Sequence, residues 1–312
     1  MKQKMGVVMD PIQHILPNHD GTLTLLLAAQ ARGWELFYME PGDLYAENAS
    51  AYGMVRPLTV FDDEQHWFDC GLVEYLPLNE LDVILMRKDP PFTMDYVYLT
   101  YLLELAEKQG TRVLNSPSGL RDANEKAFIL SFPTCIAPTL VSANQAVIRQ
   151  FIAREQEVIL KPLDGMGGAS IFYVTPEDKN LSVILENMTQ KNHKQIMAQR
   201  YLPEIRQGDK RIILVNGEPI VPYALARMPQ QNEIRANMAA GGKGHCVPLS
   251  ARDQWLCQQI APVLRQKGLF LVGLDVIGDY ITEINVTSPT CMREISDGIG
   301  VNVSNLIIEK IS

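Results

Sequence analysis

The stretch Lys161-Pro162-Leu163-Asp164-Gly165-Met166-Gly167-Gly168-Ala169-Ser170 lies between two segments with the apolar character of β-strands. Glycines without side chains let backbone N–H groups come close to phosphate oxygens, and a lysine at the end of the preceding strand adds positive charge. The pattern predicts a loop, carrying Gly165, Gly167 and Gly168, that covers the phosphates of a nucleotide. Because glycine also turns a chain between strands for structural reasons alone, a simple turn is the alternative for this stretch taken by itself.

Length and composition describe an ordinary globular protein. The chain has 312 residues, 46% hydrophobic and 21% charged, which is enough for two or three domains with their own cores. A formal net charge of −8 argues against a nucleic-acid partner, which demands a basic surface. An acidic chain still binds ATP where its lysines and arginines cluster and magnesium offsets the phosphate charge.

The cysteines and the N-terminal region indicate a cytoplasmic protein. Five cysteines include no CxxC pair and no zinc spacing, and the odd number fits reduced thiols. The first residues lack the apolar run of a signal peptide, and no window reaches the roughly 18 apolar residues of a membrane span. We therefore expect no membrane partner.

The first third of the chain alternates strands with helices, which predicts a parallel sheet covered on both faces. Ligands of such sheets bind at the carboxyl ends of strands, where Arg87 falls. Arg87 is either a substrate contact or an ordinary surface charge. The expected strands are Met5 to Met9, Trp34 to Met39, Asp82 to Met86 and Arg112 to Leu114, and the expected helices are Leu23 to Arg32 and Met94 to Gln109.

Two further units follow, so that we expect domains at 1–123, 124–202 and 203–312. A helix from about Ser118 to Phe132, carrying Lys126, marks the first boundary. The central α+β unit should contain strands Pro138 to Val141, Val158 to Lys161, Ser170 to Val174 and Gln195 to Arg200, with helices Ala143 to Arg154 and Leu181 to Thr189.

The last unit should contain two hairpins and two helices. Asn216-Gly217 predicts a type I′ turn between strands Arg211 to Val215 and Pro219 to Arg227. Ser250 and Asp253 have the spacing of a capping box before a helix Ala251 to Lys267. A final hairpin, Phe270 to Ile277 and Tyr280 to Val286, precedes a closing helix from about Val301.

Residues 228–244 show neither the strand nor the helix period and form a long connection. They are either a disordered surface loop or a flexible lid that closes over a reacting centre and brings Arg235 and Lys243 to it.

Three oxygen-bearing side chains in the final hairpin, Asp275, Glu283 and Asn285, are ligands of the kind that Mg²⁺ prefers. Glu283 and Asn285 share a strand face. A plain two-residue turn at Gly278-Asp279 would put Glu283 on the face opposite Asp275, whereas a three-residue loop or a bulge would bring the two carboxylates together. We expect an odd-length loop here; a solvated sheet face is the alternative.

Together these features suit magnesium-assisted phosphoryl transfer from ATP, with Arg211 and Arg227 holding a developing anion. The chain has neither the G-x-x-x-x-G-K-[ST] motif of P-loop enzymes nor the H-R-D motif of protein kinases.

The motifs Met86-Arg87-Lys88-Asp89-Pro90-Pro91-Phe92, Lys161 to Phe172 and Thr282 to Cys291 closely resemble those of the bacterial glutathione synthetase family, from Gly6 to about Glu294. The resemblance implies an α/β ATP-grasp architecture: an N-terminal parallel α/β domain, a small central α+β lid domain and a C-terminal α+β domain. It also implies that ATP phosphorylates the cysteinyl carboxylate of γ-glutamylcysteine and that the amine of glycine attacks the acyl phosphate. By the same resemblance we expect a homo-oligomer, a tetramer in this family. We also expect one or two Mg²⁺ ions, with Mn²⁺ as a possible substitute.

The same resemblance assigns roles to individual residues. Lys126 and Lys161 would contact ATP phosphates, Gln199, Tyr201, Leu202 and Asp209 would hold adenine and ribose, and Asp275, Glu283 and Asn285 would bind magnesium. Arg211, Arg227 and Arg235 would act in catalysis, and Arg87, Asn285, Ser288 and Pro289 would line the peptide or glycine site. For Asp209 and Pro289 a plain turn residue is the alternative. The alternatives for the whole chain are another ATP-grasp carboxylate–amine ligase, such as a D-alanine–D-alanine type, and a nucleotide-binding module without catalysis.

Overall fold

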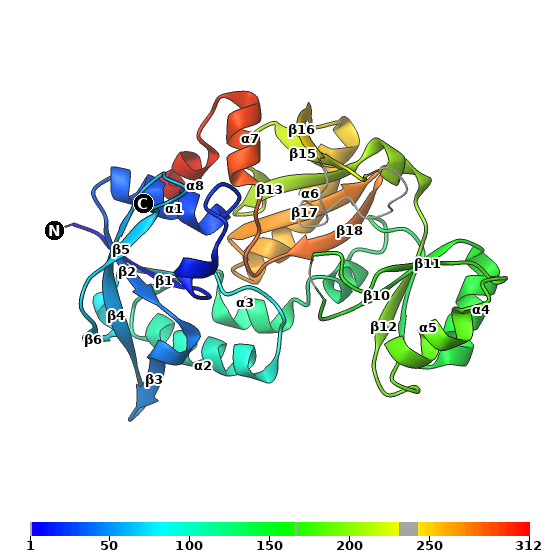
Figure 1. The fold of residues 1–312 in the computed structure, drawn as a ribbon, viewed down its shortest axis with the longest axis horizontal. Coiled ribbons are helices and arrows are strands. Elements are labelled where there is room, and N and C mark those ends of the chain that lie inside the picture. The colour runs from blue at the N-terminus through cyan, green and yellow to red at the C-terminus, as the bar shows by residue number, and fades with distance from the viewer. Residues whose placement is uncertain (1, 166, 231–242) are drawn as a thin grey trace.

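Three β-sheets organise the chain in this computed structural model, which describes residues 2–165, 167–230 and 243–312. Figure 1 shows the N-terminal sheet at one end of the long axis, the sheet of strands β9 to β12 at the other, and the C-terminal sheet between them. The division into three domains at 1–123, 124–202 and 203–312 stays a prediction. Among the described residues, no helix has the length and apolarity that crossing a membrane requires.

The N-terminal sheet has the strand order β3-β4-β2-β1-β7-β8, with β5 and β6 also paired to β4. Its centre is parallel, as predicted: β1 (Lys4–Val8), β2 (Glu35–Met39), β7 (Val83–Met86) and β8 (Arg112–Leu114). The sheet as a whole is mixed, which corrects the expectation of a purely parallel one. The antiparallel strands are β3 (Leu44–Glu47), β4 (Ser50–Val60), β5 (Phe68–Cys70) and β6 (Glu74–Pro77).

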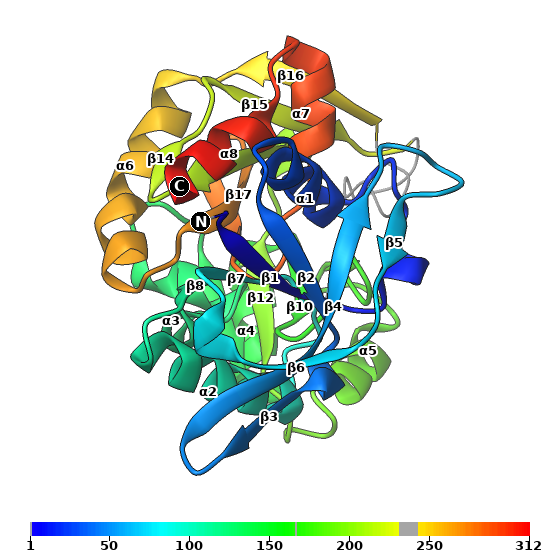
Figure 2. The same ribbon diagram turned by 90° about the vertical axis from the view of Figure 1, so that its left-hand side faces the viewer.

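Helices cover both faces of this sheet because successive strand side chains point to opposite sides. Val7 packs in the same core as α1 (Gly21–Ala31), and its neighbour Val8 packs in the core of α2 (Met94–Lys108). Figure 2 shows α1 with α8 (Val303–Ile311) on one side of the sheet and α2 on the other. The carboxyl ends of β1 and β7 consequently face the rest of the molecule.

The predicted helix over 118–132 is wrong, since the chain forms α3 (Pro117–Asp122) and a separate 3₁₀ turn (Ala127–Ser131). The side chain of Asn124 accepts hydrogen bonds from the N–H groups of Lys126 and Ala127, which starts the second turn. Lys126 therefore stands in a connector between the two elements.

The central unit is an antiparallel sheet in the order β11-β10-β12-β9. Helices α4 and α5 pack on it through a compact apolar cluster. The predicted elements are confirmed with small shifts; the strand expected from Ser170 begins at Phe172, because Ser170 has a left-handed φ of 56° at the end of the glycine loop. The elements are β9 (Thr139–Ser142), α4 (Gln145–Glu155), β10 (Val158–Pro162), β11 (Phe172–Val174), α5 (Leu181–Met188) and β12 (Ile196–Arg200).

The C-terminal sheet runs β16-β15-β13-β17-β18, with the short β14 paired to β13. Asn216 and Gly217 have φ of 51° and 78°, as the predicted type I′ turn requires, and the capping box of Ser250 and Asp253 is present. The elements are β13 (Asp209–Val215), β14 (Glu218–Pro219), β15 (Tyr223–Met228), β16 (Lys243–Pro248), α6 (Ala251–Gln266), β17 (Leu271–Ile277) and β18 (Tyr280–Asn285).

Two expectations about the ends of this region are corrected. The predicted loop 228–244 is strand at both ends, because Met228 closes β15 and pairs with Lys243 of β16. Residues 231–242, and with them Arg235, lie outside the described residues, so the lid stays a prediction. The closing helix predicted from about Val301 is confirmed as α8, but the expectation of two helices in this unit missed α7 (Met292–Ile299), which ends before Gly300 with its φ of 70°.

Candidate active site

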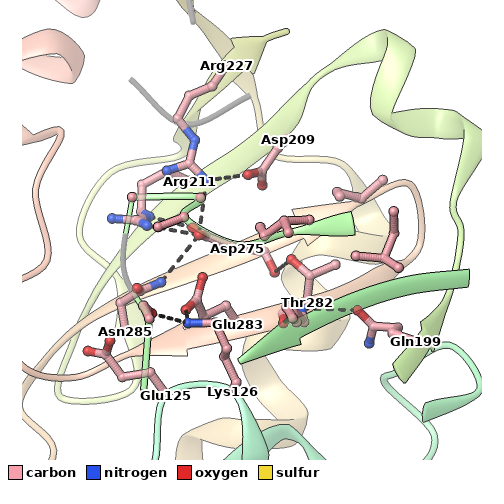
Figure 3. A pocket seen from close by; sticks show the side chains of 18 of the residues that line it. Glu125, Lys126, Gln199, Asp209, Arg211, Arg227, Asp275, Thr282, Glu283 and Asn285 are labelled. Atoms are coloured by element: carbon pink, nitrogen blue, oxygen red, sulfur yellow. Dashed lines mark hydrogen bonds and ion pairs between the residues drawn. The ribbon is translucent and has the colours of Figure 1, made fainter. Parts of the chain in front are cut away.

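A cavity of about 300 Å³ opens between the central sheet and the C-terminal sheet. Its walls come from β10, β12, the glycine loop, β13, β15, β17, β18 and the segment after β18 (Figure 3). Most of the predicted site residues line it: Lys126, Lys161, Gly165, Gly167, Gly168, Gln199, Tyr201, Leu202, Asp209, Arg211, Arg227, Asp275, Glu283, Asn285, Ser288 and Pro289. Arg87 is not part of the lining.

A β-bulge brings the two hairpin carboxylates together. Asp275 pairs with Glu283 while Val276 pairs with Ile281, so Thr282 has no partner in the ladder. The expected odd-length loop is wrong, because only Gly278 and Asp279 separate Ile277 from Tyr280. The bulge, which was the alternative route to the same pairing, restores the facing of Asp275 and Glu283.

Asp209, Arg211, Arg227 and Asp275 form one buried cluster, the arginine end of the cavity. Arg211 binds Asp275 through two N–H groups, with 2.8 Å between Nη2 and Oδ2. Arg227 Nη2 contacts Asp209 Oδ2 and lies 3.0 Å from Asp275 Oδ2. Two cations and two carboxylates therefore offset each other's charge with little exposure to water.

The two carboxylates of the arginine end differ in pKa. Burial alone would raise the pKa of Asp275, but the guanidinium groups of Arg211 and Arg227 bring it down to about 2. Burial raises the pKa of Asp209 to about 6 against the attraction of Arg227. The Oδ1 atom of Asp209 has no hydrogen-bond partner among the described residues. Asp275 is thus the carboxylate that the arginines hold ionised.

Lys126, Lys161 and Glu283 form the opposite, lysine end of the cavity. Lys161 Nζ donates to two neutral oxygens, Gln199 Oε1 at 3.3 Å and Thr282 O at 3.0 Å. Burial lowers the pKa of Lys161 to about 8, the attraction of Glu283 opposes this shift, and the charge of Lys126 adds to it. Lys126 Nζ lies 2.8 Å from Glu283 Oε1 and also donates to the carbonyl of Gly165 in the glycine loop. The side chains of this end hold two cations against one carboxylate, which suits a bound polyanion.

Beside the lysines the cavity has an apolar section. Ile159, Ile171 and Leu202 line it with Tyr201, whose ring packs edge-on against Tyr173 with centroids 5.0 Å apart. Flat aromatic ligands fit walls of this composition.

The hairpin donors also fit a hard divalent cation. Asp275, Glu283 and Asn285 offer oxygen atoms from neighbouring register positions, and Asn285 Nδ2 donates to Asp275 Oδ2 at 3.3 Å. Two carboxylates and one carboxamide are an oxygen-only set, as Mg²⁺ prefers. Larger groups of three or more His, Cys, Asp and Glu that could hold a metal do not occur in the described parts of the chain.

Arg87 supports the segment after β18, residues 286–290, which we term the strap. Its Nε donates to Thr22 Oγ1 at 3.0 Å and its Nη2 to the carbonyl of Pro289 at 2.9 Å. The guanidinium is buried behind the strap, and its Nη1 has no partner within the described residues. The structure does not support Arg87 as an ordinary surface charge, and its contact with substrate stays a prediction.

Sequence reasoning missed several residues of the cavity wall, chiefly Glu125, Asp89, Thr282, Thr287 and Cys291. Burial and the negative charge of Glu283 raise the pKa of Glu125, although hydrogen bonds from Thr287 and Val286 oppose the shift. Its position directly before a candidate phosphate-binding lysine was a usable signal. The sequence held no comparable signal for Thr282, because its position in the cavity wall depends on the bulge.

Solved structures share the fold at low sequence identity. D-cycloserine synthetase DcsG superposes with a TM-score of 0.68 at 12% identity, over 99% of this chain and 100% of its own. D-alanyl-alanine synthetase A from Vibrio cholerae gives a TM-score of 0.61 at 12% identity, over 99% and 97%. These likenesses concern the ATP-grasp fold alone.

Sequence comparison identifies the family. Residues 3–121 match the N-terminal domain of prokaryotic glutathione synthetase, and residues 125–300 match its ATP-grasp domain. The glutathione synthetase of Pseudomonas aeruginosa is 55% identical over 312 residues, covering 100% of this chain and 98% of its own length. That of Escherichia coli K12 is 51% identical over 308 residues, covering 99% and 97%. Matches of this identity and length, on a chain whose cavity gathers the expected side chains, mean that the protein belongs to the prokaryotic glutathione synthetase family.

Proposed function

We propose that this protein joins glycine to γ-glutamylcysteine with ATP, through an acyl phosphate, and releases glutathione, ADP and phosphate. It is an ATP-dependent ligase of the glutathione synthetase family. The observation that carries the proposed route is the pairing of a cation-rich lysine end with a neutralised arginine end around one cavity. The first suits a triphosphate and the second a reaction centre of fixed geometry.

In the first step a carboxylate oxygen of the cysteinyl residue attacks the γ-phosphorus of ATP, and the bond from that phosphorus to ADP breaks. Lys126 and Lys161 would hold the phosphates, since both ammonium groups line the cavity beside the glycine loop. Gly165, Gly167 and Gly168 would cover the transferred group. Excluding water matters here because an acyl phosphate hydrolyses readily.

In the second step the amine of glycine attacks the acyl carbon, and the carbon–oxygen bond to phosphate breaks. The ammonium group of glycine loses one proton to water to become the attacking amine, and the nitrogen passes a second proton to the departing phosphate as the amide forms. Arg211 and Arg227 would stabilise the negative charge of the acyl phosphate and of the tetrahedral intermediate. Both guanidinium groups are positioned by Asp275 before any substrate binds.

We assign Mg²⁺ to Asp275, Glu283 and Asn285, as one or two ions, with Mn²⁺ as a possible substitute. An ion held by these residues would offset the negative charge of the phosphates. Gln199, Tyr201 and Leu202 would hold adenine beside the apolar section, and Asp209 would hold ribose or serve only as the partner of Arg227. Asn285, Ser288 and Pro289, with Arg87 behind them, would form the peptide or glycine site, and Arg235 would join the catalytic arginines from the segment outside the described residues.

We further propose a cytoplasmic homo-oligomer, a tetramer by family resemblance, with no nucleic-acid or membrane partner. The whole-chain similarity to bacterial glutathione synthetases supports this.

Coupled measurement of ADP release tests the reaction. We expect release with γ-glutamylcysteine and glycine together, and only background release when either is omitted or when D-alanine replaces glycine. No ADP release with the complete mixture would overturn the proposal. Release with D-alanine alone would indicate a D-alanine–D-alanine type ligase, and ATP binding without turnover would indicate a nucleotide-binding module.

A further inference from the structure

The connector residues Asn124, Glu125 and Lys126 touch three walls of the cavity. Asn124 Nδ2 donates to the carbonyl of Leu163, at the beginning of the glycine loop, at 3.0 Å. Lys126 binds Gly165 in the same loop and Glu283 in β18. Glu125 lies between them, and neither step of the reaction above uses it.

One oxygen of Glu125 holds the strap. Glu125 Oε1 accepts hydrogen bonds from Val286 N at 2.9 Å, Thr287 N at 3.0 Å and Thr287 Oγ1 at 2.8 Å. The backbone carbonyl of Glu125 also accepts from Ile284 N at 2.9 Å. Three donors on one carboxylate oxygen fix the direction in which the chain leaves β18, because hydrogen bonds to a charged acceptor are short and strong.

The far part of the strap is fixed by residues that follow β7. Ser288 Oγ donates to Asp89, and Arg87 Nη2 donates to the carbonyl of Pro289. Ligands of a parallel sheet bind at the carboxyl ends of its strands, and the residues that contact the strap directly follow the carboxyl end of β7. We therefore expect the peptide substrate on the side of the cavity that the strap lines.

We propose that Glu125 is a positioning residue for γ-glutamylcysteine, acting through Thr287 to set the strap against the residues that follow β7. The proposal rests on the function proposed above. The expected consequence is selective. Loss of Glu125 should weaken the binding of γ-glutamylcysteine and leave the binding of ATP, which the glycine loop and the lysines hold, largely unaffected.

The test compares Glu125→Ala, Glu125→Gln, Thr287→Val and the Glu125→Ala/Thr287→Val double variant in the ADP-release assay. We expect Glu125→Ala to raise the KM for γ-glutamylcysteine roughly tenfold or more, as the loss of charge-assisted hydrogen bonds predicts, with the KM for ATP within about twofold. Glu125→Gln keeps an oxygen acceptor without the negative charge and should recover part of the affinity for γ-glutamylcysteine. Adding Thr287→Val to Glu125→Ala should change little, since both act through one contact.

Activity of the wild-type enzyme separates this proposal from the proposed function, because an inactive wild type contradicts the function and an active one leaves only Glu125 in question. Glu47→Ala, an exposed glutamate of β3, is the matched control and should leave both KM values unchanged. An unchanged KM for γ-glutamylcysteine in Glu125→Ala, with only a lower melting temperature, would reduce Glu125 to a structural residue and overturn the proposal. Equal impairment by Gln and Ala, or independent effects of Glu125 and Thr287, would do the same.

Discussion

At the arginine end of the cavity every buried cation faces a carboxylate, whereas at the lysine end Lys161 has only neutral oxygens as partners. The arginine cluster is balanced before any substrate arrives, so its geometry is part of the folded framework. Lys161 carries the cost of burial without a charged contact, and a phosphate would relieve that cost. The arginine end therefore holds its side chains in fixed positions, and the lysine end is suited to binding a phosphate.

The largest effect should come from Asp275→Asn. The change leaves Arg211 and Arg227 with Asp209 alone, and breaking a buried ion pair costs about 3–5 kcal/mol. We expect urea unfolding without magnesium to show this loss, and ADP release to fall roughly 1000-fold as the arginines lose their positions.

Asp279→Asn is the matched control for this change, because Asp279 is exposed in the turn of the same hairpin. A free energy of unfolding for Asp275→Asn within about 1 kcal/mol of wild type would contradict the view that the arginine end is part of the framework.

Lys161→Met should have the second-largest effect, and it should impair ATP binding without lowering the free energy of unfolding. We expect the KM for ATP to rise roughly 100-fold, because a buried ammonium group near the phosphates is lost. The unfolding free energy at pH 7 should be equal to or higher than that of wild type, since a buried charge with neutral partners is replaced by an apolar chain.

The pH dependence of unfolding sharpens this test. The pKa of Lys161 is about 8 in the folded protein and 10.5 ordinarily. Between these values the unfolded chain binds the proton that the folded protein has released, so stability rises with pH. Relative to Lys161→Met, wild type should gain about 2 kcal/mol between pH 8 and 9.5. A flat difference would show that Lys161 is not destabilised by burial. Lys179→Met, an exposed lysine of the same unit, controls for charge removal and should follow wild type in both KM and pH dependence.

Gly273→Ala should have the smallest effect. It tests whether the position of the Arg211 side chain matters, because it removes no charge from the arginine end. An added Cβ would lie 3.1 Å from Arg211 Cδ and 3.0 Å from Pro289 Cβ, so both must move by a few tenths of an ångström. We expect kcat to fall roughly tenfold or less, with the KM for ATP unchanged. Gly42→Ala is the matched control because nothing lies within 4 Å of its added Cβ. An unchanged kcat, or a change confined to the KM for ATP, would contradict the view that the arginine end sets the catalytic geometry separately from ATP binding at the lysine end.

Much of this organisation was predictable from local sequence patterns. The parallel strands, the central sheet, the Asn216-Gly217 turn, Lys161 with its glycine loop, and the candidate arginines and carboxylates follow from periodicity, turn chemistry and charge, whereas the role of Lys126 came from the family resemblance. Local rules suffice there because each element carries its own signal.

What could not be predicted depends on contacts between distant segments. Arg87 was assigned to substrate or to solvent, yet it ties Thr22 to Pro289, which are 267 residues apart in the chain. Nothing local to Glu125 shows that its carboxylate holds Thr287. The break between α3 and the turn at Ala127 was missed because the hydrogen bonds of Asn124 override an otherwise helical pattern.

The bulge at Thr282 determines which face of the hairpin the residues after it in β18 occupy. Without the bulge, the two-residue turn would pair Asp275 with Thr282 and place Glu283 on the opposite face of the hairpin. The same extra residue leaves the carbonyl of Thr282 outside the ladder, where it accepts a hydrogen bond from Lys161 Nζ. Deletion of Thr282 would keep Asp275 opposite Glu283 in a regular ladder but would remove the backbone acceptor of Lys161, whereas a substitution at Thr282 keeps that acceptor. This position should therefore tolerate a change of side chain better than the loss of the residue.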